Sequence, residues 1–304
     1  MANLLDLRRR IKSVKNTQQI TKAMKMLAAV NLRRAQERVV NARPFANKMT
    51  GVLTELAAHT DENYHHPLLD ARGDERYLLV LITADKGLAG AFNANLIKAA
   101  QAFLRENEGK SVELMAVGRK GRDFFRRREI EIVREDIGLT GKGRVSYAEA
   151  VELAGEIMRR YREDESLDKV FVIYNEFRSV LQQRVIVEQL LPVSRSAAAG
   201  EQAEEQTAAA AGQPQVFIDY IYEQSPEEIF GRLLPRLIET QVFRALLESI
   251  ASEQGARMTA MDSASKNAGE LIGALTLNMN RIRQAAITTE IIEVVSGAAS
   301  ASSG

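Results

Sequence analysis

The chain has 304 residues, of which 45% are hydrophobic and 27% are charged. These proportions are typical of a globular protein with enough apolar material for a core, and the length suggests about two domains. The 41 basic and 40 acidic residues give a net charge of +1, so bulk charge indicates no partner. The absence of cysteine excludes disulfides, thiolate metal ligands and cysteine nucleophiles. We expect neither a signal peptide nor a membrane-spanning helix, because no suitably long apolar segment is present.

The N-terminal segment, residues 3–57, has the pattern of one long helix. Over its second half, apolar residues recur at alternating spacings of four and three, which defines a heptad seam. The residues of this seam are Ala28, Leu32, Ala35, Val39, Ala42, Ala46, Met49, Leu53 and Leu56. The same spacing occurs near the start, at Leu4, Leu7, Ile11 and Val14. Around Gln18–Met24 the phase slips, so we expect a stutter there, and we expect Pro44 to kink the helix or to lie at an exposed bend.

The middle of the chain, residues 70–195, has the rhythm of an α/β domain, because short β-rich runs alternate with helical ones. The predicted strands are Tyr77–Ile82, Val112–Val117, Ile130–Val133 and Val170–Tyr174, and the predicted helices are Asn93–Glu106 and Ser146–Arg162. This alternation favours a parallel or mostly parallel sheet with covered faces. Residues 196–214 belong to a low-complexity stretch that is typical of a flexible insert. A last candidate strand, Gln215–Tyr222, extends the α/β domain over residues 215–223.

A second long helix is predicted from about residue 225 to Ser296. Ser225 can cap it, Pro226 suits its first position, and the two acids that follow favour the positive end of the helix dipole. Its seam consists of Met261, Ala264, Ala268, Leu271 and Leu275.

The two long segments, residues 1–57 and 225–304, are predicted to form an antiparallel coiled coil. If the hairpin closes at the α/β domain, the numbers of paired residues sum to about 282, and position 24 lies beside about position 258. The stretch beyond Ile282 then has no partner in its own chain, although it is rich in Ile and Val. Apolar surface of that kind indicates a partner molecule.

The usual catalytic and nucleotide-binding constellations are missing. The turn Asp85–Gly90 follows a strand and precedes a helix, where α/β proteins often bind ligands, yet it fits neither the Walker A nor the G-x-G-x-x-G pattern. It is either a small-anion site or a tight turn, and we favour the turn. Gly118–Gly121 and Gly141–Gly143 are interpreted as plain loops. The only histidines are His59, His65 and His66. With no further ligand evident near them, we expect no metal site, no cofactor and no catalytic residue.

Basic residues are concentrated near the N-terminus. Residues 1–43 contain eleven Lys or Arg against two acids, and residues 119–128 contain six against one. A basic long helix could follow nucleic-acid phosphates, it could face an acidic protein surface, or it could be the solvated face of a coiled coil.

Several motifs resemble one known family. They are NTQQITKAMKM at residues 16–26, DKGLAG at 85–90, ARMTAM at 256–261 with Asn267 and Ala268 after it, and NRIRQAAITTE at 280–290. Together they are similar to the γ subunit of F-type ATP synthases. The resemblance implies an α/β fold plus a long antiparallel coiled coil, with a Rossmann-like domain inserted between the N- and C-terminal helices.

The resemblance also implies a role without bond chemistry and without a cofactor. The shaft of the family stands inside a hexamer of three α and three β subunits, and its base sits with ε on the c-ring of the membrane sector. Ion flow turns the ring, and the shaft drives the β sites through their states. The implied location is peripheral, on the cytoplasmic face of the bacterial inner membrane.

Site residues follow from the matched motifs only. Met24 and Lys25, with Glu253 and Arg257 nearby, match the region of the β lever loop. Arg283 and Gln284 match the pair that hydrogen-bonds the β catch loop, and Thr288 lies one turn further along. Tyr220 and Tyr222 are expected near ε or the c-ring. Lys25 stands where some family members carry an acid, which would alter the lever contact.

Two other hypotheses compete with the shaft. The basic N-terminal helix would suit a nucleic-acid-binding arm, which predicts binding that weakens steeply with salt. The turn Asp85–Gly90 would suit an α/β enzyme with a saturable small ligand. We rank both below the shaft.

Overall fold

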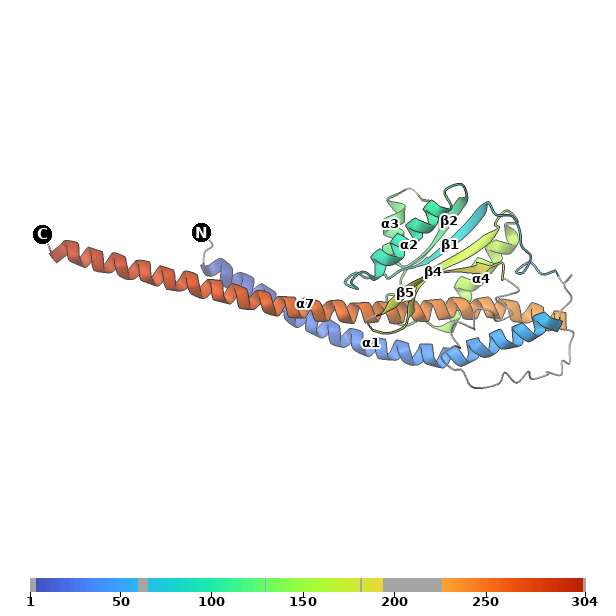
Figure 1. The fold of residues 1–304 in the computed structure, drawn as a ribbon, viewed down its shortest axis with the longest axis horizontal. Coiled ribbons are helices and arrows are strands. Elements are labelled where there is room, and N and C mark those ends of the chain that lie inside the picture. The colour runs from blue at the N-terminus through green and yellow to red at the C-terminus, as the bar shows by residue number, and fades with distance from the viewer. Residues whose placement is uncertain (1–3, 60–64, 129, 181, 194–225, 303–304) are drawn as a thin grey trace. The chain divides into compact units, whose positions relative to one another are not determined.

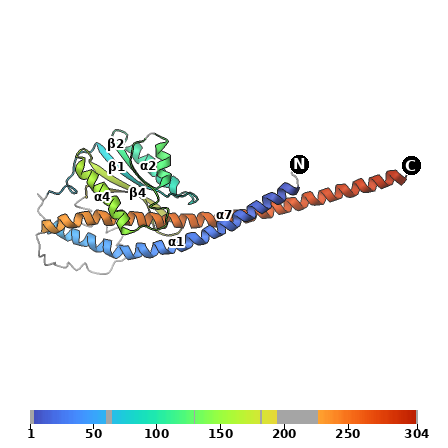
Figure 2. The same ribbon diagram turned by 180° about the vertical axis from the view of Figure 1, so that it is seen from behind.

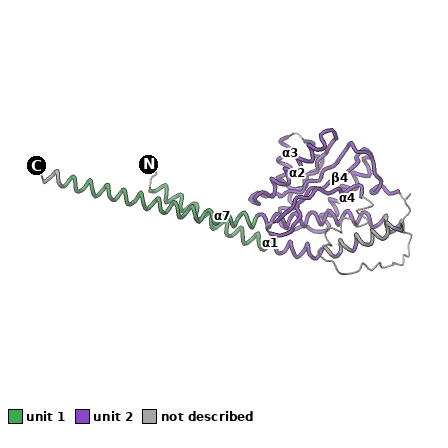
Figure 3. Tube along the Cα trace, in the orientation of Figure 1, with its two compact units in different colours: residues 1–29, 257–304 green, residues 30–256 purple. Residues whose placement is uncertain are grey.

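The computed structural model describes residues 4–59, 65–128, 130–180, 182–193 and 226–302. The chain divides into two compact units, one made of residues 1–29 and 257–304 and the other of residues 30–256 (Figure 3). We call them the shaft unit and the base unit. The predicted insert at 196–214, the candidate strand Gln215–Tyr222 and the proposed cap Ser225 lie outside the described residues.

Two long helices contribute to both units, α1 (Leu4–His59) and α7 (Pro226–Ser302) (Figure 1). They confirm the two long helices that the periodicity predicts, and α7 begins at its proline, whose missing N–H costs nothing at a first helical position. Pro44 lies inside α1 with an exposed side chain, and Pro235 lies inside α7.

The seam of the shaft unit runs without a phase slip. Buried or half-buried positions recur along this part of α1 at spacings of three and four, with Met24 and Ala29 half-buried beside them. The recurring positions are Leu4, Leu7, Ile11, Val14, Gln18, Thr21, Lys25 and Ala28. The predicted stutter is therefore wrong. It arose because Gln18, Thr21 and Lys25 are polar, so a pattern of apolar residues alone loses the seam where polar side chains occupy it.

The opposite side of this seam also differs from the prediction in one place. On α7, Met261 and Ala268 are buried as expected, but Leu271 is about half exposed and Ile272 is the more covered residue. The register agrees with the hairpin argument, since Gln18 Nε2 donates a 3.2 Å hydrogen bond to the carbonyl oxygen of Ser265 and these residue numbers sum to 283.

The base unit contains one five-stranded sheet. Its strands are β1 (Arg76–Ile82), β2 (Ser111–Val117), β3 (Ile132–Asp136), β4 (Lys169–Phe177) and β5 (Gln183–Leu191), and its shorter helices are α2 (Phe92–Glu106), α3 (Arg119–Arg126) and α4 (Tyr147–Glu163). The spatial order is β3-β2-β1-β4-β5. The first four strands are parallel, with Leu79 opposite both Leu114 and Phe171, and β5 is antiparallel to β4.

Three features of this sheet differ from the sequence prediction. The strand predicted at Ile130–Val133 lies further along, at Ile132–Asp136. The antiparallel strand β5 was not predicted, because pairs of polar residues flank its short apolar run and leave neither strict alternation nor a long apolar segment. Gly118–Gly121, interpreted as a plain loop, instead leads into α3, for which Gly118 occupies the N-cap position.

The core of the base unit surrounds the central strands. β1 is buried from Tyr77 to Ile82, and Leu79 and Leu81 pack in one cluster with residues of α2 and with Phe125 of α3. A capping box of Ser146 and Glu149 starts α4.

The part of α7 within the base unit is buried along much of its length, so this helix belongs to the core rather than to the surface. Its buried residues include Leu234, Leu237, Ile238, Val242, Ala245, Leu246 and Ile250. Figure 2 shows the same elements from behind.

Candidate functional surfaces

The crevice at the carboxyl ends of the parallel strands is where an α/β fold would place a ligand. Here the carboxylate of Asp85 occupies it. Asp85 accepts hydrogen bonds from the backbone N–H groups of Arg119 at 3.0 Å, Gly138 at 3.0 Å and Gly141 at 2.7 Å. The hydroxyl of Thr140 lies 3.1 Å from the same carboxylate. One carboxylate thus holds the loops that follow β1, β2 and β3, and the donors that an anion would need are already used.

Gly118 completes this crevice. Its φ of 91° lies in the region that favours glycine, and a Cβ at this position would collide with the carbonyl oxygen of Thr83. The close approach lets the Gly121 N–H donate to the Thr83 hydroxyl at 2.9 Å. The turn interpretation of Asp85–Gly90 is favoured by this geometry over the anion-site interpretation.

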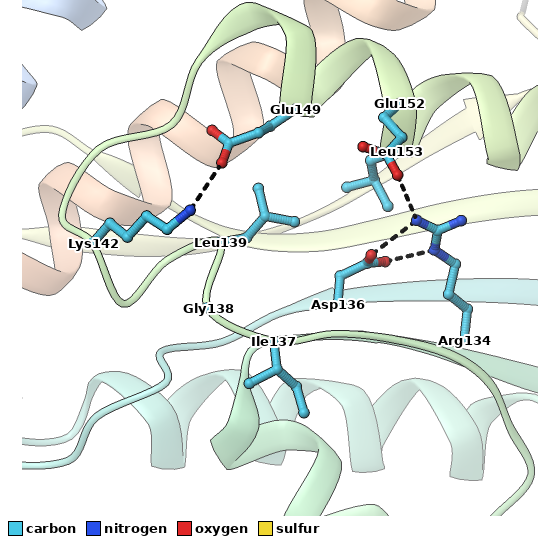
Figure 4. Close-up of a pocket in the computed structure, with 9 residues that line it drawn as sticks. All are labelled: Arg134, Asp136, Ile137, Gly138, Leu139, Lys142, Glu149, Glu152 and Leu153. Carbon is cyan, nitrogen blue, oxygen red and sulfur yellow. Dashed lines mark hydrogen bonds and ion pairs between the residues drawn. The ribbon is translucent and has the colours of Figure 1, made fainter.

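A pocket of about 200 Å³ lies beside β3, between the loop at residues 137–142 and α4 (Figure 4). Its charged groups are paired with one another. Arg134 donates to Asp136 at 2.8 and 2.9 Å and lies 3.9 Å from Glu152, while Lys142 is 3.5 Å from Glu149. Two cations and three carboxylates line the pocket, and each of them already has a partner of opposite charge among the others, so we assign no site here.

No group of three or more His, Asp or Glu side chains suited to a metal occurs among the described residues. His65 instead lies 3.4 Å from Asp70, and the ring of His66 accepts a 3.2 Å bond from the Leu68 N–H. Burial lowers the pKa of His66, so its ring is neutral near pH 7.

The polar part of the shaft seam contains one of the residues assigned from the motifs. Lys25 Nζ lies 2.6 Å from Asp262 Oδ1, and Lys266 Nζ lies 3.0 Å from the other oxygen of Asp262. The hydrogen bond from Lys25, and to a lesser extent the one from Lys266, lowers the pKa of Asp262. Met24, next to Lys25, is half-buried. The ammonium group of Lys25 is therefore directed to its own chain.

The surface of α1 in the shaft unit combines apolar and basic groups. Ile20, Met26 and Leu27 are each about 60% exposed. The exposed basic residues of α1 in the shaft unit are Arg8, Arg9, Arg10, Lys12, Lys15 and Lys22, and Arg33, Arg34 and Arg38 are exposed on the part of α1 that belongs to the base unit. An exposed apolar and basic helix face suits an acidic protein surface better than a purely solvated role.

The other assigned residues differ in their accessibility. Glu253 in the base unit and Arg257 in the shaft unit are both buried. Arg283, Gln284 and Thr288 are exposed, and the Thr288 hydroxyl donates back to the Gln284 carbonyl at 2.9 Å. Tyr220 and Tyr222 lie outside the described residues.

The C-terminal stretch of α7 is an apolar surface that the shaft unit leaves open. Every residue from 283 to 298 is exposed. The large apolar residues in this stretch are Ile287, Ile291, Ile292, Val294 and Val295. Within the described residues, the prediction that this stretch finds no cover in its own chain is confirmed, and exposed apolar surface of this kind indicates an interaction site.

Some residues that matter to the architecture could not be found in the sequence. Tyr174 on β4, Glu188 on β5 and Arg244 on α7 form one polar cluster, although up to 70 residues separate them. No motif links them. The only available signal is that charged residues interrupt the apolar face of a helix, which many solvated helices also show.

These features define a class of protein in which an α/β domain is inserted between two long helices and binding groups, rather than catalytic ones, are exposed. The chain matches the family model described as ATP synthase over residues 3–301. It is 50% identical to an ATP synthase gamma chain of Solibacter usitatus (strain Ellin6076) over 304 residues, which cover 99% of this chain and 100% of the relative. It is 51% identical to an ATP synthase gamma chain of Geobacter sp. (strain M21), with 99% of each chain covered.

Solved structures of ATP synthases share this fold. The central stalk of the Tetrahymena thermophila mitochondrial ATP synthase, solved with its c-ring, aligns with a TM-score of 0.57 and 26% identity, covering 81% of this chain and 99% of that one. A chain of the Euglena gracilis mitochondrial ATP synthase aligns with a TM-score of 0.63 and 20% identity, covering 96% and 92% respectively, which supports the fold.

The chain therefore belongs to the ATP synthase gamma-chain family. Its members are non-catalytic subunits. In the described part of the chain, no helix combines the length and the apolarity that crossing a membrane requires.

Proposed function

We propose that this chain is the central rotor shaft of an F-type ATP synthase, which transmits torque between the membrane c-ring and the α3β3 hexamer. Ion flow through the membrane sector drives ATP synthesis through it, and hydrolysis drives the reverse. The observation that carries the proposal is the open apolar stretch of α7 at residues 283–298, in a chain that matches its family over nearly its whole length. Exposed apolar residues of this kind are expected to be covered by surrounding subunits.

The C-terminal contact is assigned to a small set of exposed groups. Arg283 and Gln284 would hydrogen-bond the catch loop of a β subunit, with Thr288 one helical turn further along. All three are exposed, and they share the stretch with Ile287 and Ile291. Polar anchors among apolar contacts give such an interface direction as well as affinity, because hydrogen bonds fix orientation while apolar contacts do not.

The lever contact is assigned to the region around Met24 and Lys25. Because Lys25 is held by Asp262, its role is to fix the surface that meets the acidic β lever, and Ile20 and Leu27 are the exposed apolar groups of that surface. Glu253 and Arg257 are buried, so they would support this region from inside their units rather than touch the partner.

The base unit is proposed to sit with ε on the c-ring, with Tyr220 and Tyr222 near that contact. The complex is membrane-bound, and we place this chain at the cytoplasmic face of the bacterial inner membrane as a peripheral subunit. The solved central stalk of Tetrahymena thermophila, described together with its c-ring, supports this arrangement.

Co-expression with the α and β subunits tests the proposal. We expect a particle with one copy of this chain for three α and three β subunits. Its ATPase activity should fall when Arg283→Ala and Gln284→Ala are combined. Glu270→Ala, a change at an exposed position of the same helix outside residues 283–298, is the matched control and should leave the activity unchanged. Elution of this chain alone, while α and β assemble normally, would contradict the proposal.

A further inference from the structure

Within the base unit, α7 meets the sheet through polar contacts as well as apolar ones. The Phe177 N–H at the end of β4 donates to Glu248 Oε2 at 2.9 Å, and the Ser252 hydroxyl donates to the Asn175 carbonyl at 3.1 Å. Arg244 donates to the Tyr174 hydroxyl at 3.2 Å. The three helix residues are spaced by four, which puts them on one face of α7, and all three meet the second half of β4.

The third of these contacts is part of a closed cluster. The Tyr174 hydroxyl donates to Glu188 Oε2 on β5 at 3.1 Å, and Arg244 lies 3.5 Å from the same carboxylate. Burial, together with the negative charge of Glu188, raises the pKa of Tyr174, so its hydroxyl keeps the proton that it donates. Two neighbouring strands are thereby joined to one guanidinium on the helix.

A fourth contact comes from the helix that covers the sheet. The Tyr147 hydroxyl on α4 donates to Glu239 Oε2 at 2.8 Å, and the Tyr147 ring meets the Phe243 ring edge-on at a centroid distance of 5.4 Å. Glu239 is also paired with Arg236 at 3.0 Å. Polar and aromatic contacts thus hold α7 from the sheet and from α4.

The surroundings of these contacts explain why they matter for torque. The residues of α7 between them are mostly small or aliphatic, among them Ala245, Leu246, Ile250 and Ala251. Apolar packing is non-directional, so a smooth apolar face resists separation far better than it resists sliding or rotation about the helix axis. A hydrogen bond weakens steeply when its angle or distance changes, so it resists those motions directly.

We propose that Arg244, Glu248 and Ser252 fix the rotational position of α7 on the sheet, so that rotation of the α/β domain is transmitted to the helix without slip. The inference rests on the proposed rotor function and adds to it the positioning residues through which torque enters α7. Because α7 is one continuous helix from Pro226 to Ser302, rotation fixed at these residues continues along the same backbone into the shaft unit.

Torsional stiffness tests this inference. The chain would be assembled with α3β3, the hexamer fixed to a surface, and a bead attached to the base unit through Lys98→Cys, an exposed position in a chain without cysteine. Tyr174→Phe combined with Ser252→Ala removes two hydroxyl groups, and with them three hydrogen bonds, with little change in side-chain volume. We expect the variance of the bead angle at a catalytic pause to rise roughly twofold, since directional contacts are lost while apolar burial remains.

The control is Arg159→Ala, which removes exposed ion pairs with Glu156 and Glu163 within α4 and leaves α7 untouched. Its angular variance should equal that of the parent chain. Equal variance in the double variant and the control, with rotation intact, would overturn the inference while leaving the rotor function in place. Absence of assembly and rotation in the parent chain itself would instead overturn the rotor function.

Thermal unfolding distinguishes rotational slip of α7 on the sheet from a general loss of stability. If the double variant does not assemble, Tyr174→Phe alone carries the same measurement, because it keeps the ring and removes only the hydroxyl. A rise in angular variance at an unchanged melting temperature supports the inference that these contacts fix the rotational position of α7. A fall in melting temperature at unchanged variance contradicts it and shows that the contacts contribute to stability only.

Discussion

The base unit and the shaft unit differ in how their apolar residues are covered. In the base unit, β1 and the buried part of α7 are covered by the chain's own strands and helices. In the shaft unit, polar residues enter the seam and residues 283–298 are left exposed. A single helix, α7, shows both solutions along its length. The difference indicates that the base unit buries its apolar core within the chain, whereas residues 283–298 of the shaft unit are left for other subunits to cover.

The comparison is tested most strongly at Leu246, which is fully buried in the base unit. Leu246→Ala should lower the free energy of unfolding by about 2–5 kcal/mol, because it removes buried methyl groups and leaves a cavity. Leu277→Ala, at a position that is 75% exposed in the shaft unit, is the matched control and should change it by no more than about 0.5 kcal/mol. Urea unfolding followed by circular dichroism measures both. Equal losses would mean that the two regions of α7 do not differ as described.

A second test replaces the polar seam of the shaft unit by an apolar one. Gln18→Leu with Thr21→Leu should raise the stability of the coiled coil by roughly 1 kcal/mol but weaken its unique register, because buried polar groups specify pairing at a cost in stability. Spin labels at Lys12→Cys and Glu270→Cys would report the register, since a slip of one heptad moves a helix by about 10 Å. A single unchanged distance in the variant would show that the polar residues do not set the register.

A third change should leave the isolated chain almost unaffected and act only on assembly. Ile291→Asp with Val295→Asp places charge on two residues that are about 60% exposed. The free energy of unfolding should change by less than about 0.5 kcal/mol, as for other surface substitutions. Recovery of the α3β3 complex with this chain should drop sharply, because the charges would have to be buried. Full assembly of the variant would show that this stretch is not covered in the complex.

The smallest expected effect is a pH dependence of the shaft unit. The folded-state pKa of Asp262 is lowered by Lys25 and Lys266, so the carboxylate contributes stability above about pH 4 that is lost as the pH falls through the folded pKa. The Lys25–Asp262 pair is partly exposed and therefore contributes little. Between pH 5 and pH 3, the melting temperature of the parent chain should fall more than that of Asp262→Asn. If the melting temperatures of the two chains fall in parallel with pH, the Asp262 carboxylate does not contribute to the stability of the shaft unit.

Much of the fold could be predicted because apolar patterns are local. The two long helices, β1, β2, β4, α2 and α4 follow from runs and periodicities within short windows. β5 could not be predicted, because its apolar run Val185–Val187 is too short to be decisive and the polar pairs on either side break any alternation.

The candidate surfaces were predictable to a lesser extent. The exposed C-terminal stretch follows from helix length alone, since one arm of the hairpin is longer than the other. The pairing of Lys25 with Asp262 and the cluster around Arg244 depend on residues that are distant in sequence. A charged side chain on a helix has the same local pattern whether it faces water, a partner or its own chain.

The carboxylate of Asp85 has a consequence for regulation. In an α/β domain with an open crevice, the cellular level of a nucleotide could be sensed directly by occupancy. Here a side chain of the protein is a permanent occupant, attached covalently and never diluted, and it holds three loops at once. An anion would bind at this crevice only by displacing the carboxylate from these N–H donors. The crevice is therefore built to join the loops of the base unit to one another rather than to exchange ligands with the surroundings.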